Sequence, residues 1–199
     1  QDIMISIDIK LQDSVEQALK AGVEDPRIAG EKGTSVVMDA ATGEIYAICS
    51  LPYLDPTNRE EAESDAFNLS PVSQAFEPGS IFKTVSTTAV LENKVMSPED
   101  TLFCPSAIQA DEYEVSDAHD RGDETMTLRQ ILDKSSNVGI SLASEKLGFS
   151  KLYDAIIRYN LNEATGVDYP GEASGYLLDY TDWALITGYN VCLLYTSDA

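Results

Sequence analysis

The chain has 199 residues, of which 43% are hydrophobic and 24% are charged, and this composition is typical of a globular domain. Thirteen basic and 34 acidic residues give a formal net charge of −21, which argues against a nucleic-acid partner because phosphate neutralisation needs Lys and Arg. No apolar run approaches the roughly 20 residues of a membrane span, and no signal segment opens the chain, so we expect any membrane anchor to lie outside it.

The N-terminal part of the chain predicts a strand, a helix and a hairpin. Alternating apolar residues over Ile3–Ile7 indicate a short strand, and the amphipathic pattern that follows indicates a helix that ends near Gly22. Ser35–Met38 and Glu44–Cys49 predict the two strands of a hairpin, joined by the turn "DAATGE", in which Gly43 supplies a positive φ angle.

The rest of the chain predicts helices separated by loops. A helix is expected over Ser80–Asn93, and residues 97–124, which contain an acidic cluster from Asp111 to Glu124, predict a loop-rich insertion. The segment "MTLRQILDKSSNVGISLASEKLG" predicts two helices, with a Thr127–Gln130 capping box opening the first and Gly148 closing the second. No repeat or linker is visible, so the sequence predicts one domain that mixes helices and strands, an α/β chain of the α+β type.

Cysteine and histidine give little sign of a metal or redox site. Cys49, Cys104 and Cys192 match no metal or redox motif, although a Cys49–Cys104 disulfide is compatible with an oxidising compartment. The only histidine, His119, lies among acidic residues, where a solvated loop is a commoner arrangement than a metal site. We therefore expect neither a metal ion nor a cofactor.

The segment "EPGSIFKTVSTTAVLE" combines a serine with a lysine three residues later. Positions i and i+3 of a helix share a face, about 5–6 Å apart at Cβ, so Lys83 can reach the hydroxyl of Ser80. The surrounding apolar residues predict a buried lysine whose pKa falls toward neutrality, and a neutral amine can take a proton from a serine nucleophile. The alternative is a capping serine and a lysine that extends to solvent, because the pattern is common by chance.

The segment "DKSSNVGISLA" places Ser135 and Asn137 two residues apart at a helix junction. In a tight turn both side chains can point into one cleft, where a hydroxyl can relay protons and an amide can bind a peptide group. The alternative for this segment is a helix cap made of polar turn residues.

These motifs together carry a family resemblance. "FEPGSIFKTVS" followed by "SSN", with "YLDPTN" before and "TGVDYPGEASG" after, resembles the class B penicillin-binding proteins, and most closely the division-type peptidoglycan transpeptidases. The resemblance implies the penicillin-binding, serine β-lactamase-like transpeptidase fold, with a helical part packed on an antiparallel sheet. It covers residues 1–191 as a partial transpeptidase domain, whereas residues 192–199 form a tail that does not resemble the family.

The resemblance also implies a role for each motif residue. Ser80 would be the acylated nucleophile, Lys83 its general base, Ser135 a proton shuttle to the leaving group, and Asn137 a ligand of the acyl donor's peptide backbone. The implied partners are peptidoglycan stem peptides, β-lactam antibiotics and other cell-wall synthesis or divisome proteins. The implied location is the bacterial cell membrane, with the catalytic domain outside the cytoplasm.

The sequence departs from the family pattern in its third motif. A Lys-Thr/Ser-Gly triplet is absent, and the nearest match, Lys83-Thr84-Val85, lacks the glycine. We expect the motif to lie beyond Ala199, so that the fold is incomplete at the C-terminus and the 199-residue chain alone is inactive.

Three alternatives use the same fold. A class A serine β-lactamase would need a glutamate where "RYNLN" has Arg158. A β-lactam sensor would share the first two motifs and carry a membrane domain before them. An inactive interaction module is disfavoured by the intact motif residues.

Overall fold

The computed structural model describes residues 4–193, and the predicted tail 192–199 therefore lies outside the described residues from 194 onward. The chain divides into two compact units, Gln1–Ala75 with Gly166–Ala173, and Phe76–Thr165 with Ser174–Ala199. Each unit is described by itself below, and all four candidate site residues belong to the second.

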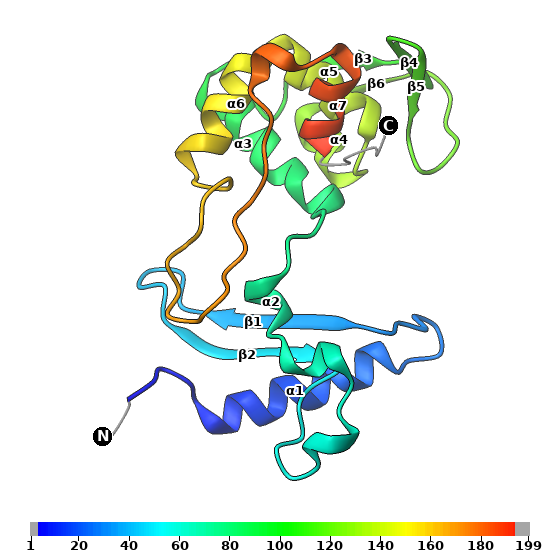
Figure 1. Ribbon diagram of the computed structural model, residues 1–199. Helices are drawn as coiled ribbons and strands as arrows, with labels where there is room; N and C mark the ends of the chain where they lie inside the picture. The colour runs from blue at the N-terminus through cyan, green and yellow to red at the C-terminus, as the bar shows by residue number, and fades with distance from the viewer. Residues whose placement is uncertain (1–3, 194–199) are drawn as a thin grey trace. The chain divides into compact units, whose positions relative to one another are not determined.

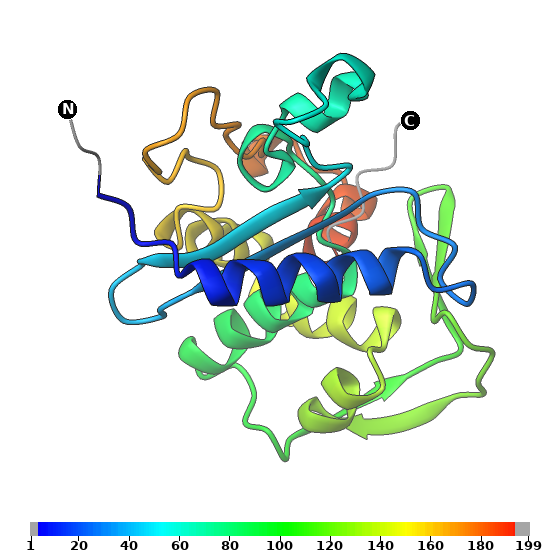
Figure 2. The same cartoon turned by 90° about the horizontal axis from the view of Figure 1, so that it is seen from below.

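The first unit is built on one helix and one hairpin (Figure 1). Helix α1 (Ile9–Val23) lies along the antiparallel hairpin of β1 (Gly33–Met38) and β2 (Ile45–Leu51), as Figure 2 shows. The predicted hairpin is confirmed, and Gly43 in its turn has a φ of 78°. A short helix, α2 (Ser70–Ser73), completes the unit with two 3-10 turns, Arg59–Glu61 and Ser64–Phe67.

The strand predicted over Ile3–Ile7 is wrong for the residues that the structure describes. Residues 4–8 pass beside β2 with one main-chain bond, from Asp8 N–H to Tyr46 O at 2.9 Å. The Asp8 side chain then accepts the N–H groups of Lys10 and Leu11, so it caps α1 and starts a helix instead. The helix ends at Val23, one residue beyond the predicted Gly22.

The second unit is a helical core with two small sheets. A 3-10 helix, Gly79–Phe82, leads directly into α3 (Lys83–Glu92), and the strands pair as β3 with β6 and β4 with β5, both antiparallel. The remaining bounds are β3 (Thr101–Cys104), β4 (Ala107–Ala110), β5 (Tyr113–Ser116), β6 (Glu124–Thr127), α4 (Leu128–Asp133), α5 (Asn137–Leu147), α6 (Phe149–Arg158), the 3-10 helix Tyr180–Asp182 and α7 (Leu185–Leu193).

The segment 97–124, predicted as a loop-rich insertion, contains three strands and the start of a fourth, which the prediction missed. Each strand has only four residues and buries a single side chain, so the apolar alternation that reveals a strand is too short to see. The buried side chains are Cys104, Ala110, Val115 and Met126.

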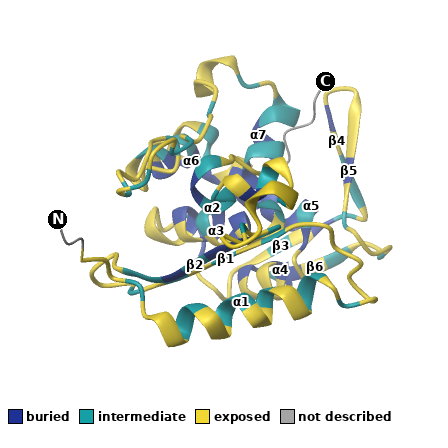
Figure 3. Cartoon of the chain, turned by 60° about the horizontal axis from the view of Figure 1, so that its bottom comes forward, coloured by how far each residue is buried: buried dark blue, intermediate teal, exposed yellow. Residues whose placement is uncertain are grey.

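Helix α5 is the centre of the second unit. It packs against α3, α4, α6 and α7 and against β3 and β5, and its side chains are buried on nearly every face. Figure 3 shows buried residues gathered in these helices, whereas α1 of the first unit is largely exposed. The predicted capping box of Thr127 and Gln130 is confirmed at the start of α4, and Gly148 ends α5 with a φ of 92°.

The cysteines of the described residues are all buried and free, so the disulfide that the sequence left open is not formed. Within residues 4–193 no three His, Cys, Asp or Glu side chains form a group that could hold a metal ion. None of the helices in this part of the chain is long and apolar enough to cross a membrane.

The packing of α4 on α5 predicts a specific effect of a methyl group at Gly139. A Cβ atom there would lie 2.7 Å from Cγ1 and 2.9 Å from Cγ2 of Ile131, which is fully buried. We expect Gly139→Ala to lower the free energy of unfolding by about 1–3 kcal/mol, because overpacking a tight core strains side chains and backbone. Thermal unfolding of the full-length protein measures this.

Gly22→Ala is the matched control, since no heavy atom lies within 4 Å of a Cβ atom at that helical position. It should be neutral or should stabilise by about 0.5–1 kcal/mol through helix propensity. A Gly139→Ala variant as stable as the wild type would contradict the close packing of α4 on α5.

Candidate active site

The local helix geometry brings Ser80 and Lys83 together. Gly79 takes a φ of 61° after Pro78, and the 3-10 helix Gly79–Phe82 begins there. A 3-10 helix has three residues per turn, so positions i and i+3 eclipse. The side chain of Lys83 therefore lies beside that of Ser80, with Nζ 3.1 Å from Oγ. Ser80 itself is exposed, as a nucleophile must be to meet a substrate.

Lys83 is buried where the sequence predicted a buried lysine. Its side chain is only 2% exposed, although it carries the one formal charge between Glu77 and Glu92. Burial lowers the pKa of Lys83 below its usual value, and the negative charge of Asp117 opposes this shift without reversing it. The lysine is thus biased toward the neutral amine that can act as a base.

Four oxygen atoms surround the amine of Lys83. Nζ lies 2.6 Å from the carbonyl of Ser135, 2.7 Å from Oδ1 of Asn137, 3.0 Å from Oγ of Ser135 and 3.1 Å from Oγ of Ser80. A neutral amine has two N–H groups and one lone pair. The two shortest contacts are to oxygens that can only accept, so they take the N–H groups, and the lone pair is left for one of the two hydroxyls. The arrangement thus supports proton transfer from either serine.

The turn between α4 and α5 presents Ser135 to the lysine. Ser135 N–H bonds Leu132 O at 3.0 Å and Ser136 N–H bonds Ile131 O at 2.9 Å, the pair of bonds that defines a Schellman helix end. Ser135 takes the left-handed position of this motif, with a φ of 53°, where glycine is the usual residue. A serine there is disfavoured by about 1–2 kcal/mol, yet its hydroxyl and carbonyl both contact Lys83.

Asn137 begins α5 and is bound on both sides of its amide. Its Oδ1 accepts from Lys83, and its Nδ2 donates to the carbonyl of Ser116 at 2.9 Å. Within residues 4–193 the second N–H of the amide has no protein acceptor, so it is the group that a peptide ligand could use. The amide therefore positions the lysine, a task that the sequence did not predict.

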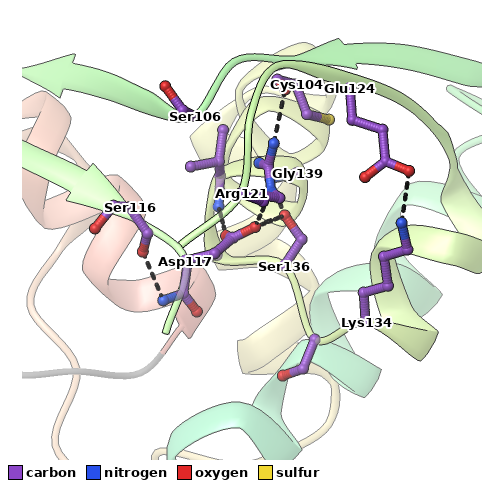
Figure 4. A network of polar contacts seen from close by, with 12 residues as sticks. Cys104, Ser106, Ser116, Asp117, Arg121, Glu124, Lys134, Ser136 and Gly139 are labelled. Carbon is purple, nitrogen blue, oxygen red and sulfur yellow. Dashed lines mark hydrogen bonds and ion pairs between the residues drawn. The ribbon is translucent and has the colours of Figure 1, made fainter. Parts of the chain in front are cut away.

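Sequence reasoning missed the residues behind this turn. Asp117, which we placed in a solvated loop, accepts hydrogen bonds from Ser136 Oγ, from Val138 N–H and from Arg121 Nε (Figure 4). Burial alone would raise the pKa of Asp117, but these bonds and the charge of Arg121 hold it below its usual value. One signal could have found the pair: Arg121 is the only Lys or Arg in residues 111–124.

Comparison with known proteins gives one family. The family model described as the penicillin binding protein transpeptidase domain matches residues 33–196. Penicillin-binding protein PbpB of Mycobacterium tuberculosis is 33% identical over 184 residues, which cover 92% of this chain and 27% of that protein. Peptidoglycan D,D-transpeptidase FtsI of Escherichia coli is 29% identical over 183 residues, which cover 92% of this chain and 30% of FtsI.

Solved structures agree with this match. The crystal structure of penicillin binding protein 3 from M. tuberculosis, complexed with aztreonam, superimposes with a TM-score of 0.85 at 32% identity, covering 94% of this chain and 42% of that one. The likeness confirms the predicted mixed helix and strand fold class. The chain spans less than a third of the length of both curated relatives named above.

The burial of Lys83 predicts its titration directly. In the full-length protein with ¹³C-labelled lysine, we expect the Cε signal of Lys83 to titrate with a midpoint below the ordinary value of 10.5, because burial disfavours the charged form. Loss of the signal in Lys83→Arg assigns it. A midpoint at or above 10.5 would mean that the charge of Asp117 outweighs burial.

Proposed function

Because this chain belongs to the family of penicillin-binding protein transpeptidase domains, we propose that the whole protein is a serine D,D-transpeptidase that cross-links peptidoglycan stem peptides. One observation carries the proposal. The buried amine of Lys83 lies 3.1 Å from the hydroxyl of the exposed Ser80 and also contacts Ser135 and Asn137. This is a nucleophile with an adjacent base, and the base is held by further groups.

The first step is acylation of the serine. The neutral amine of Lys83 takes the proton of Ser80 while Oγ attacks the carbonyl carbon between the two D-alanines of a stem peptide. The new C–O bond replaces the C–N bond, and the departing D-alanine nitrogen receives a proton through the hydroxyl of Ser135. The N–H of Ser80 supports the oxyanion of the tetrahedral intermediate, and the N-terminal end of its helix favours negative charge there.

The second step resolves the acyl-enzyme. An amine from a neighbouring stem peptide attacks the ester carbonyl, its proton returns to Ser80 through Lys83, and a new peptide bond forms the cross-link. β-Lactams acylate Ser80 by the same first step, because their strained amide takes the place of the donor peptide bond. The complex of the related M. tuberculosis protein with aztreonam supports β-lactams as ligands.

We further propose a role in cell division, with divisome proteins as partners and the catalytic domain held at the outer side of the bacterial membrane. The support is the resemblance of "YLDPTN", "EPGSIFK" and "SSN" to the division-type transpeptidases. The hydrolase alternative has no comparable support, since Arg158 ends α6 in a surface ion pair with Glu92.

The proposal predicts which serine a penicillin labels. In the full-length protein, a fluorescent penicillin should add its mass to the peptide that contains Ser80, detected by mass spectrometry. Ser80→Ala should abolish the label because the nucleophile is gone, and Ser97→Ala, which removes an exposed hydroxyl elsewhere, should retain it. Failure of the wild-type protein to label would refute the proposed function.

Lys83→Arg tests the base. Arginine keeps the positive charge but does not deprotonate in proteins, so we expect acylation by the fluorescent penicillin to slow by at least about a hundredfold, the lower range for loss of a general base. Lys146→Arg, an exposed change in the last turn of α5, should label at the wild-type rate. Equal rates for Lys83→Arg and wild type would show that another group takes the proton.

A further inference from the structure

A buried ion pair lies directly behind the catalytic turn and has no part in the chemistry above. Asp117 follows β5, and Arg121 lies four residues later in the connection to β6. The side chains of Asp117 and Arg121 are only 11% and 16% exposed, respectively. Each of the other ion pairs of the described residues has at least one side chain that is 39% or more exposed. Ion pairs are rarely placed out of water without a compensating set of hydrogen bonds.

Both side chains of the pair have further hydrogen bonds, and most of these run to the Asp117 carboxylate. It accepts the N–H of Val138 at 3.0 Å, the hydroxyl of Ser136 at 2.9 Å and Nε of Arg121 at 2.5 Å (Figure 4). Arg121 is anchored in turn, since its Nη1 donates to the carbonyl of Cys104 at 2.9 Å. Three donors from three directions fix the plane of the carboxylate, and the carboxylate then fixes its donors.

Two of these donors belong to the start of α5. Ser136 is the N-cap of the helix, and its Oγ accepts the N–H of Gly139 at 2.9 Å while donating to Asp117. Asp117 accepts the N–H of Val138, the residue before Gly139, which also has no acceptor within the helix. The first turn of α5 is therefore capped jointly by its own serine and by a carboxylate from another segment, at the end of the helix that attracts negative charge.

The capped turn is the one that holds Lys83. Ser135 and Asn137 flank Ser136, and they supply three of the four oxygens around the amine. Asn137 is also tied to the carbonyl of Ser116, the residue before Asp117. The segment 116–117 is thus hydrogen-bonded to the turn at Ser136, Asn137 and Val138. These bonds fix the positions of the oxygens of Ser135 and Asn137.

We propose that Asp117 is a positioning residue for acylation of Ser80, acting through Ser136 and the first turn of α5 on the groups that hold Lys83. This rests on the proposed function. The carboxylate makes no hydrogen bond to the nucleophile or to the base, so apart from the long-range effect of its charge on Lys83 it acts through the turn. Its removal affects how fast the bound β-lactam reacts, not how well it binds.

Asp117→Asn in the full-length protein tests this. All three partners of the Asp117 carboxylate are hydrogen-bond donors. The asparagine side chain that replaces it has only one acceptor oxygen, and its NH₂ group would face donors with which it cannot bond. The rate of acylation by a fluorescent penicillin, measured against its concentration, separates the maximal rate constant from the dissociation constant of the first complex. We expect the rate constant to fall about tenfold to a hundredfold, as for a misplacement near 1 Å, and the dissociation constant to change less than about threefold.

Glu124→Gln is the matched control. It removes a carboxylate from the other end of the same connection, where Glu124 pairs with the half-exposed Lys134 at 2.6 Å and makes no hydrogen bond to α5 within residues 4–193. Its rate constant should stay within about twofold of wild type. If Glu124→Gln lowers the rate constant as much as Asp117→Asn does, the effect comes from losing a negative charge between β5 and β6, and the proposal is overturned.

The outcomes separate the two proposals. If the penicillin does not label the wild-type protein, the proposed function is refuted. If it labels the wild type, and a folded Asp117→Asn variant is acylated with an unchanged rate constant, the positioning role alone is overturned. If Asp117→Asn does not fold by circular dichroism, Ser136→Ala, which removes one donor, decides by the same rate constant. If neither variant folds, the cluster is required for folding and the positioning proposal is overturned.

Discussion

The contact of one buried amine with four oxygens is the constraint on which the candidate active site depends. Lys83 is removed from water, and an amine in that position needs hydrogen-bond partners in the protein. Ser80, in the 3-10 helix that leads into α3, supplies one of them, and the other three come from residues 52 and 54 positions later in the chain. The site therefore exists only where the turn before α5 is held against α3.

The identity of the turn residues follows from this constraint. A Schellman helix end prefers glycine in its left-handed position, and glycine would avoid the strain that Ser135 carries there. Glycine, however, has no hydroxyl to place beside Lys83. The strain is compatible with a stable fold because the neighbouring Ser136 is fully buried and bonded on two sides, so the turn has few other conformations.

Residue spacing predicted the local pairing of the site, and the family resemblance added Ser135 and Asn137, but neither reached Asp117 and Arg121 behind the turn. The pairing of Ser80 with Lys83 and the Thr127 capping box each span three residues, and helix geometry fixes such short spacings. The bond from Ser136 to Asp117 spans nineteen residues, and it depends on β4 and β5, which are too short to show a periodic pattern. Nothing in the spacing of an acidic segment shows which acid turns inward.

The electrostatics of the site explain why the inward-facing acid is paired with an arginine. A lone carboxylate near Lys83 would stabilise the ammonium and oppose the neutral base, and the charge of Asp117 does raise the pKa of the lysine. Arg121 places an opposite charge directly on that carboxylate, so the field that the pair exerts on Lys83 is weaker than that of the acid alone. The aspartate can then cap α5 and hold Ser136 while burial still lowers the pKa of the lysine. A neutral cap such as serine would not perturb the base, but it has a single oxygen and could not bind Val138, Ser136 and Arg121 together.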